Sequence, residues 1–254
     1  NHATQGTYPP GSTFKLITLL EYIRENPDTW QDFHYTCTGT YTNGDYVVNC
    51  HDGVAHGELD IYGILGMSCN GAFDTIAQTL NSTKWQKLAE DFGYNQSDRS
   101  QVDFPYKKSH FDIASDDSVW SRMQLAIGQG TTTVTPLLNL MIYAAIANDG
   151  VMMTPYLVDH YLDADGNVVE QTKPKALRSV CTKAEAELMD EFLTYVITNG
   201  TAAAGGSQYA RVSGKTGSAQ YDSTKNYHAW FCGYGTNDVS EIAVCVMIEK
   251  GGAG

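Results

Sequence analysis

The hydrophobic period of the chain changes near residue 210, and this change constrains the fold more than any other feature. Residues 210–221, 227–234 and 241–249 have the patterns of three successive strands, and the last two are rich in residues typical of buried strands. The middle of the chain carries helical patterns instead. Helices in the middle followed by strands at the end predict an α+β fold.

Local signals place the helices. Thr135-Pro136 combines an N-cap with proline at the first helical position, so a helix should run from there to Asp149. Thr182-Lys183-Ala184-Glu185 is a capping box and predicts a long amphipathic helix that ends at Gly200. Another helical pattern begins at Ser12 and stops near Pro27. Residues 60–67 and 71–80 form two helical patterns separated by Ser68-Cys69-Asn70, and a further one covers 83–92.

Length and charge bound the class of protein. The 254 residues fit one domain or two closely joined lobes. The formal net charge of −13 argues against a nucleic acid partner, because phosphate binding needs a basic surface. No apolar run approaches the roughly 18 residues that span a bilayer, and no signal peptide opens the chain. Because Asn1 is not a natural start, we expect a fragment of a longer protein.

Two of the six cysteines flank a predicted hairpin. Residues 35–50 have strand patterns on both sides of Asn43-Gly44, a dipeptide that favours a two-residue turn. Reflection about that turn places Tyr41 opposite Tyr46 and Cys37 opposite Cys50, within reach of a disulfide. The alternative is a pair of reduced, half-buried thiols. We find no CxxC pair and no cysteine–histidine set with zinc spacing, so the spacing predicts no metal site.

The segment Ser12-Thr13-Phe14-Lys15 can carry nucleophilic chemistry. Three residues make one helical turn, which brings the Lys15 amine beside the Ser12 hydroxyl. A serine needs a neighbouring base, and a lysine can serve when burial lowers its pKa. This spacing arises by chance about once in a chain of ordinary composition. An exposed helical lysine is the alternative for this motif alone.

Two further motifs offer polar groups for a site. Ser68 and Asn70 interrupt a helix, where a hydroxyl can relay a proton and an amide can hold a carbonyl, or where both can simply cap the next helix. Lys215-Thr216-Gly217-Ser218 lies in a predicted strand. Its lysine and two hydroxyls can bind a carboxylate, while Gly217 lets another chain approach closely. A solvated edge strand is the alternative for this segment.

Together, the three motifs resemble the S-x-x-K, S-x-N and K-T-G set of β-lactamases and penicillin-binding proteins. The segment 8–15 is similar to the nucleophile segment of class B penicillin-binding proteins, and Gly128-Gln129-Gly130 with Thr135-Pro136 resembles another segment of that family. The resemblance covers nearly the whole chain. Ser218 departs from it slightly, because threonine is commoner there.

This resemblance implies a role for each motif residue. Ser12 would be acylated by the penultimate D-Ala of a peptidoglycan stem peptide, or by a β-lactam, with Lys15 as its general base. Ser68 and Lys215 would carry a proton to the leaving group. The remaining implied roles are substrate binding by Asn70, Thr216, Gly217 and Ser218, and an oxyanion hole formed by the backbone N–H groups of Ser12 and Ser218.

The resemblance also implies an architecture and a setting. We expect a single transpeptidase domain over 1–254, truncated at both ends, in which an antiparallel sheet is flanked by helices. A mostly helical lobe with a hairpin should occupy about 30–150 and the sheet strands about 205–250, with the family's first strands and last helix outside this chain. Expected partners are stem peptides ending in D-Ala-D-Ala, β-lactams, a membrane glycosyltransferase and other cell-wall proteins. The expected location is the outer face of the bacterial cytoplasmic membrane, held by an N-terminal anchor, with no cofactor or metal.

Two other functions fit the same motifs. A serine β-lactamase needs a device that primes water for hydrolysis, and residues 93–130 contain no evident motif of that kind. A β-lactam sensor or receptor would keep the same pocket for signalling. D,D-transpeptidase activity is therefore the function that the sequence favours.

Overall fold

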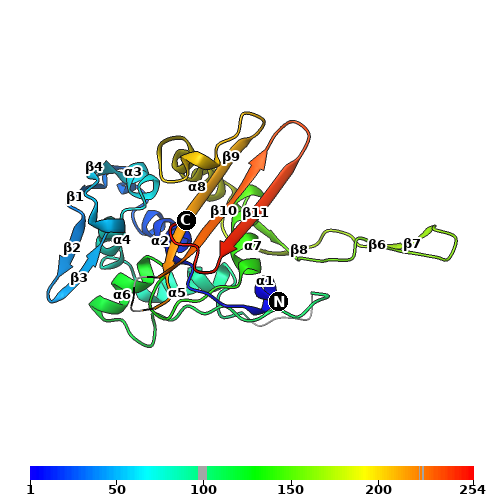
Figure 1. Cartoon of the computed structure of the whole chain (residues 1–254), viewed down its shortest axis with the longest axis horizontal. Coiled ribbons are helices and arrows are strands. Elements are labelled where there is room, and N and C mark those ends of the chain that lie inside the picture. The colour runs from blue at the N-terminus through cyan, green and yellow to red at the C-terminus, as the bar shows by residue number, and fades with distance from the viewer. Residues whose placement is uncertain (97–101, 223, 225) are drawn as a thin grey trace.

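The structure is a computed structural model that describes residues 1–96, 102–222, 224 and 226–254 (Figure 1). Among these residues, none of the helices combines the length and apolarity that crossing a bilayer requires. The helices are α1 (His2–Gln5), α2 (Lys15–Glu25), α3 (Ile61–Gly66), α4 (Asn70–Ala77), α5 (Ser82–Asp91), α6 (Val119–Ala126), α7 (Pro136–Ala147) and α8 (Lys183–Asn199). The 3₁₀ turns are η1 (Gly11–Phe14), η2 (Trp30–Asp32), η3 (His51–Gly53) and η4 (Ala203–Gly205).

A three-stranded antiparallel sheet forms from the C-terminal part of the chain. Its strands β9 (Arg211–Gln220), β10 (Tyr227–Thr236) and β11 (Glu241–Ile248) lie in the order β11-β10-β9. These are the three strands predicted from the change of period, and the α+β fold class is confirmed. In the β9–β10 register Lys215 pairs with Cys232 and Gly217 pairs with Trp230, so the third motif lies in mid-strand.

Two helices cover one face of this sheet. Helix α7 packs against β10 and β11, and α8 packs against β9, as Figure 1 shows. Both begin at the predicted caps, because the Thr135 side chain accepts the Leu138 N–H and Thr182 forms a complete capping box with Glu185. Alternate residues of β11 point away from the core, and Ile242, Val244, Val246 and Ile248 are exposed.

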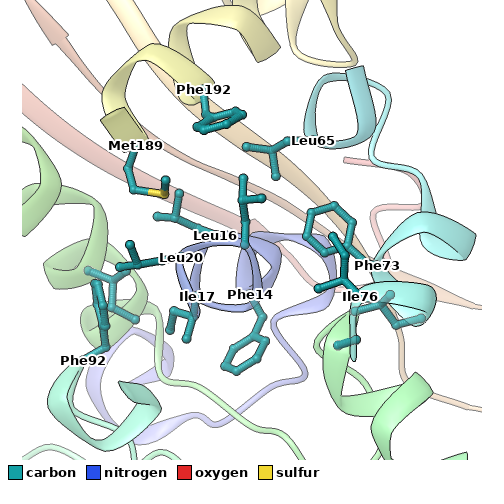
Figure 2. Close-up of a cluster of buried hydrophobic side chains, with 14 of the residues drawn as sticks. Phe14, Leu16, Ile17, Leu20, Leu65, Phe73, Ile76, Phe92, Met189 and Phe192 are labelled. Atoms are coloured by element: carbon teal, nitrogen blue, oxygen red, sulfur yellow. The ribbon is translucent and has the colours of Figure 1, made fainter. Parts of the chain in front are cut away.

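Helix α2 lies at the centre of the molecule. Its residues from Lys15 to Glu21 are all buried, which is the pattern of a helix enclosed on every side. Figure 2 shows the apolar side chains that enclose it. They come from α3, α4, the end of α5 and α8, and include Leu65, Phe73, Ile76, Phe92, Met189 and Phe192. Lys15, the lysine of the first motif, is therefore anchored in the main hydrophobic core.

The predicted hairpin forms, but in a different register. Strands β2 (Thr40–Asn43) and β3 (Tyr46–Asn49) pair so that Tyr41 lies opposite Val48, and the prediction that it faces Tyr46 is wrong. The turn is Gly44-Asp45. Gly44 has a φ of +59°, and the φ of Asp45 is not positive. That arrangement places glycine at the first turn position, as a type II′ turn requires, and not at the second as we assumed.

The flanks of that hairpin also differ from expectation. Strand β1 (His34–Cys37) pairs with β4 (Gly57–Asp60), and Cys37 lies opposite Gly57 rather than opposite Cys50. Two other antiparallel pairs carry no strong sequence signal, because their strands are short and largely exposed. They join β5 (Val151–Met153) with β8 (Ala176–Ser179), and β6 (His160–Leu162) with β7 (Val168–Gln171), which projects from the body in Figure 1.

Truncation of a core side chain on α2 should be costly. Leu20 is fully buried, so Leu20→Ala should lower the free energy of unfolding by about 2–5 kcal/mol through lost burial and a residual cavity. Leu157 is the matched control, since its side chain is 75% exposed and Leu157→Ala should change stability by less than about 0.5 kcal/mol. Urea unfolding of both variants measures the difference. Equal effects would contradict the central position of α2.

Candidate active site

Ser12 lies in a tight turn that the sheet and a neighbouring loop support. It is the second residue of η1, so the chain forms a 3₁₀ turn before α2, where we expected the helix to begin at Ser12 itself. Gly11 precedes it with a φ of +56°, and its N–H donates to the Gly128 carbonyl at 3.0 Å. The Ser12 side chain is partly exposed, and its Oγ has no hydrogen-bond partner among the described residues.

Lys15 points into the core toward the second motif. Its side chain is 0% exposed, and Nζ donates to the Ser68 carbonyl at 2.8 Å, to Ser68 Oγ at 3.3 Å and to Asn70 Oδ1 at 2.7 Å. Burial lowers the pKa of Lys15 to about 8, against the attraction of Cys69, Cys50 and Asp74. The structure therefore brings the first two motifs together, with Lys15 bonded to Ser68 and Asn70 rather than to Ser12.

The second motif is a strained turn between α3 and α4. Ser68 has a φ of +54°, a conformation that a non-glycine residue adopts only when its surroundings hold it there. Cys69 follows as the N-cap of α4. The Asn70 side chain uses both of its polar ends, because its Nδ2 donates to the Asn49 carbonyl at 2.8 Å. The turn thus aims a carbonyl, a hydroxyl and an amide oxygen at one amine.

Lys215 supplies a second buried amine. It lies in β9, is 0% exposed, and its Nζ donates to the Thr216 carbonyl at 3.1 Å. Burial lowers its pKa well below the ordinary lysine value, and the positive charge of Lys15 lowers it further. Two ammonium groups buried near each other are unfavourable, so burial and mutual repulsion both favour the loss of a proton from the pair. An amine that has lost its proton can accept one from a hydroxyl group.

The rest of the third motif borders η1, which we call the nucleophile turn because it carries Ser12, the candidate nucleophile. Gly217 is needed there, since a Cβ on it would lie 3.0 Å from the Pro10 carbonyl oxygen and 3.1 Å from Thr13 Cγ2. Thr216 Oγ1 shares a 3.0 Å hydrogen bond with Thr201 Oγ1. Ser218 Oγ accepts a hydrogen bond from the Gly254 N–H at 3.0 Å. The close approach predicted for Gly217 is therefore made to the segment that carries Ser12.

Sequence reasoning missed two polar residues at this site. Thr201 lies beside Thr216, with a 3.0 Å hydrogen bond between their hydroxyls. Its position directly after Gly200, at the end of a predicted helix, is the one sequence feature that pointed to it. Asp74 is 0% exposed, and neither carboxyl oxygen has a hydrogen-bond partner within the part of the chain that the structure describes. Burial raises the pKa of Asp74 well above its ordinary value, against the attraction of Lys15. No local pattern marks one aspartate within an apolar helix face.

The two cysteines of the predicted bridge come close without the predicted register. Cys37 and Cys50 are both free thiols, and their sulfur atoms are 3.6 Å apart. The disulfide between them stays a prediction. Cys69 and His56 lie against the same pair, with Cys50 Sγ 3.8 Å from Cys69 Sγ and Cys37 Sγ 3.4 Å from His56 Nδ1. The spacing of these four residues along the chain gave no sign of this cluster.

Comparisons with known proteins agree with the geometry. Residues 1–254 match the sequence profile described as "Penicillin binding protein transpeptidase domain". Peptidoglycan D,D-transpeptidase PbpA of Mycolicibacterium smegmatis is 26% identical over 99% of this chain and 52% of its own length. The chain therefore spans about half the length of that curated relative. The resemblance to class B penicillin-binding proteins is confirmed.

Two solved structures share the fold over almost all of the chain. The D,D-transpeptidase domain of a peptidoglycan glycosyltransferase from Eggerthella lenta has a TM-score of 0.87 and 29% identity, and covers 98% of this chain and 62% of that one. Penicillin-binding protein A from M. tuberculosis, as an imipenem acyl-enzyme complex, has a TM-score of 0.86 and 25% identity. This match covers 99% of this chain and 57% of that one. Both support a transpeptidase fold here.

A methyl group at Gly217 should separate β9 from the nucleophile turn. Gly217→Ala should lower the free energy of unfolding by about 1–3 kcal/mol, because backbone and side-chain atoms already lie in tight contact with the new Cβ. Gly235→Ala in β10 is the matched control, since its Cβ would meet nothing closer than 3.8 Å. Chemical unfolding compares the two. A tolerated Gly217→Ala would argue against the close approach.

Proposed function

This chain belongs to the penicillin binding protein transpeptidase family, and we propose that it is the acyl-transfer domain of a peptidoglycan D,D-transpeptidase. One observation carries the proposal. Lys15 and Lys215 are both fully buried, and Lys15, three residues after Ser12, is hydrogen bonded to Ser68. That arrangement provides a nucleophile, a base and a proton route in one place. The family match, the PbpA relative and the transpeptidase structures support it.

In the first half-reaction the proposed nucleophile is Ser12. A neutral Lys15 amine removes the hydroxyl proton while Oγ attacks the carbonyl carbon of the penultimate D-Ala. The backbone N–H groups of Ser12 and Ser218 stabilise the negative oxygen that forms, as an oxyanion hole does. The proton on Lys15 passes by way of Ser68 and Lys215 to the nitrogen of the terminal D-Ala, which leaves when the C–N bond breaks, so Lys15 is neutral again. The product is an acyl-serine ester.

In the second half-reaction an amine from a neighbouring stem peptide attacks that ester. The amine loses a proton to the same base, the ester bond breaks, and Ser12 regains its proton, so no ATP or metal takes part in the chemistry. Asn70 holds the amide of the acyl chain. Thr216 and Ser218 bind the terminal carboxylate, and Gly217 allows the substrate-binding strand to approach the nucleophile turn. β-lactams acylate Ser12 in place of the stem peptide.

We further propose the setting in which this chain works. Its substrates are stem peptides that end in D-Ala-D-Ala, and its protein partners are a membrane glycosyltransferase and other cell-wall proteins. The protein acts at the outer face of the bacterial cytoplasmic membrane, anchored by an N-terminal segment outside this chain. The division into a helical lobe over about 30–150, which includes the undescribed residues 97–101, and sheet strands over about 205–250 also stays a proposal.

Penicillin labelling tests the nucleophile. A fluorescent penicillin should label the full-length protein covalently, and Ser12→Ala should abolish labelling while its circular dichroism spectrum and unfolding midpoint stay unchanged. Intact-mass spectrometry after a short pulse should find an adduct that lasts for minutes or longer, because no group is assigned to activate water. Labelling that survives in Ser12→Ala would place the nucleophile elsewhere. An adduct lost within seconds, with many turnovers, would identify a β-lactamase.

The pH dependence of acylation tests Lys15 as the base. Below its pKa the amine is protonated and cannot accept a proton, so the acylation rate should rise with pH and level off above about pH 8. Lys15→Ala should slow acylation by about 10²–10⁴-fold and remove this pH dependence. Stopped-flow measurement with a chromogenic β-lactam follows both. A midpoint near 10, the ordinary range for lysine, would contradict this role.

A further inference from the structure

Four potential metal ligands converge behind the second motif, outside the groups assigned to catalysis. They are Cys37, Cys50, His56 and Cys69, and their ligand atoms all lie within 4.8 Å of one another. The residues come from four separate pieces of chain: the end of β1, the residue after β3, the segment before β4, and the turn between α3 and α4. Only the fold brings them together, which explains why their spacing resembles no known zinc motif.

Three of the six distances within the cluster fit a tetrahedral ion closely. Zinc bound by thiolate at about 2.3 Å and imidazole at about 2.0 Å would place two sulfurs about 3.8 Å apart and a sulfur and a nitrogen about 3.5 Å apart. These three edges are 3.6 Å for Cys37–Cys50, 3.8 Å for Cys50–Cys69 and 3.4 Å from Cys37 Sγ to His56 Nδ1, and the other three are at most 4.8 Å. A disulfide would use only two of the three sulfurs and would leave Cys69 without a role.

The three sulfurs are shielded from solvent. Cys37, Cys50 and Cys69 are 3%, 4% and 0% exposed. The Gly39 N–H donates to Cys37 Sγ at 3.4 Å, and Cys69 is the N-cap of α4, at the positive end of that helix. Such N–H···S bonds are the usual outer support of a metal–thiolate centre. Solvent therefore has almost no access to the three cysteine side chains.

We propose that Cys37, Cys50, His56 and Cys69 form a zinc site of the structural type. Three soft thiolates and one imidazole favour Zn²⁺ over the harder divalent ions. Because all four positions are supplied by protein, the ion has no open position for substrate or water and acts as a cross-link. It ties the β1–β4 pair and the β2–β3 hairpin to the N-terminus of α4.

The position of Cys69 gives this cross-link a second consequence, which rests on the proposed function. Cys69 lies between Ser68 and Asn70, the two residues that hydrogen bond to Lys15. Ser68 keeps a left-handed conformation that its surroundings must impose. An ion bonded to Cys69 fixes that turn, so the four ligands are positioning residues for Lys15 and not catalytic residues.

The metal content of the protein tests the site independently of activity. Full-length protein purified without chelators should contain about one zinc per chain by mass spectrometry of metals. Replacement by Co²⁺ should give the visible and near-ultraviolet bands of a tetrahedral cobalt–thiolate centre. His56→Ala should lose the metal, and His56→Cys should retain it, because a fourth thiolate completes the same tetrahedron. Cys181→Ser is the matched control, since this buried cysteine lies outside the cluster, and it should keep the zinc.

Two results would overturn the site. The first is protein that binds no metal after incubation with excess zinc and keeps Cys37, Cys50 and Cys69 as free thiols. The second is a Cys37–Cys50 disulfide found by peptide mapping. The positioning role has its own test, in which His56→Ala should lower the β-lactam acylation rate by about 10-fold or more and His56→Cys should restore it. An acylation rate that does not change when zinc is lost would overturn that role. Absence of any labelling in zinc-loaded wild type would instead count against the proposed function.

Discussion

The structure depends on the burial of Lys15 and Lys215, the lysines of the first and third motifs. An isolated ammonium in the interior costs several kcal/mol, and two of them near each other cost more. Burial lowers the pKa of both lysines, and Ser68 and Asn70 surround the Lys15 amine with three oxygen acceptors. The same burial that costs stability leaves a larger fraction of each amine unprotonated near neutral pH, where it can accept a proton. Stability is therefore given up where reactivity is needed.

The polar site is held by close backbone contacts rather than by long side chains. Three chain segments meet closely here: the nucleophile turn, the loop that contains Gly128, and strand β9. Each contributes a glycine to the contact, namely Gly11, Gly128 and Gly217, where a Cβ would be crowded by the neighbouring segment. The Gln129 amide, turned so that its nitrogen donates, pairs with the backbone of Gln220 at 3.0 and 3.1 Å and ties that loop to the end of β9. The distance between Ser12 and the sheet is thus set by backbone atoms.

Much of this arrangement could be predicted from the sequence, because local signals carried it. The capping box at Thr182, the proline-capped start of α7 and the three terminal strands are short-range patterns with strong physical causes. The hairpin register could not be predicted, since glycine occupies the first turn position of a type II′ turn as readily as the second position of a type I′ turn. Asp74 and the Cys37–His56 cluster needed the full fold, because their partners are distant in the chain.

The protonation state of the two lysines is the most direct test of this account. Lysine Cε resonances in ¹³C-labelled protein, assigned with Lys15→Arg and Lys215→Arg, report each amine as pH changes. The account predicts that Lys15 titrates near pH 8 and that burial lowers the pKa of Lys215 well below the ordinary lysine value. If both amines are fully protonated at pH 7 and titrate near pH 10, burial does not activate them, and the account is contradicted.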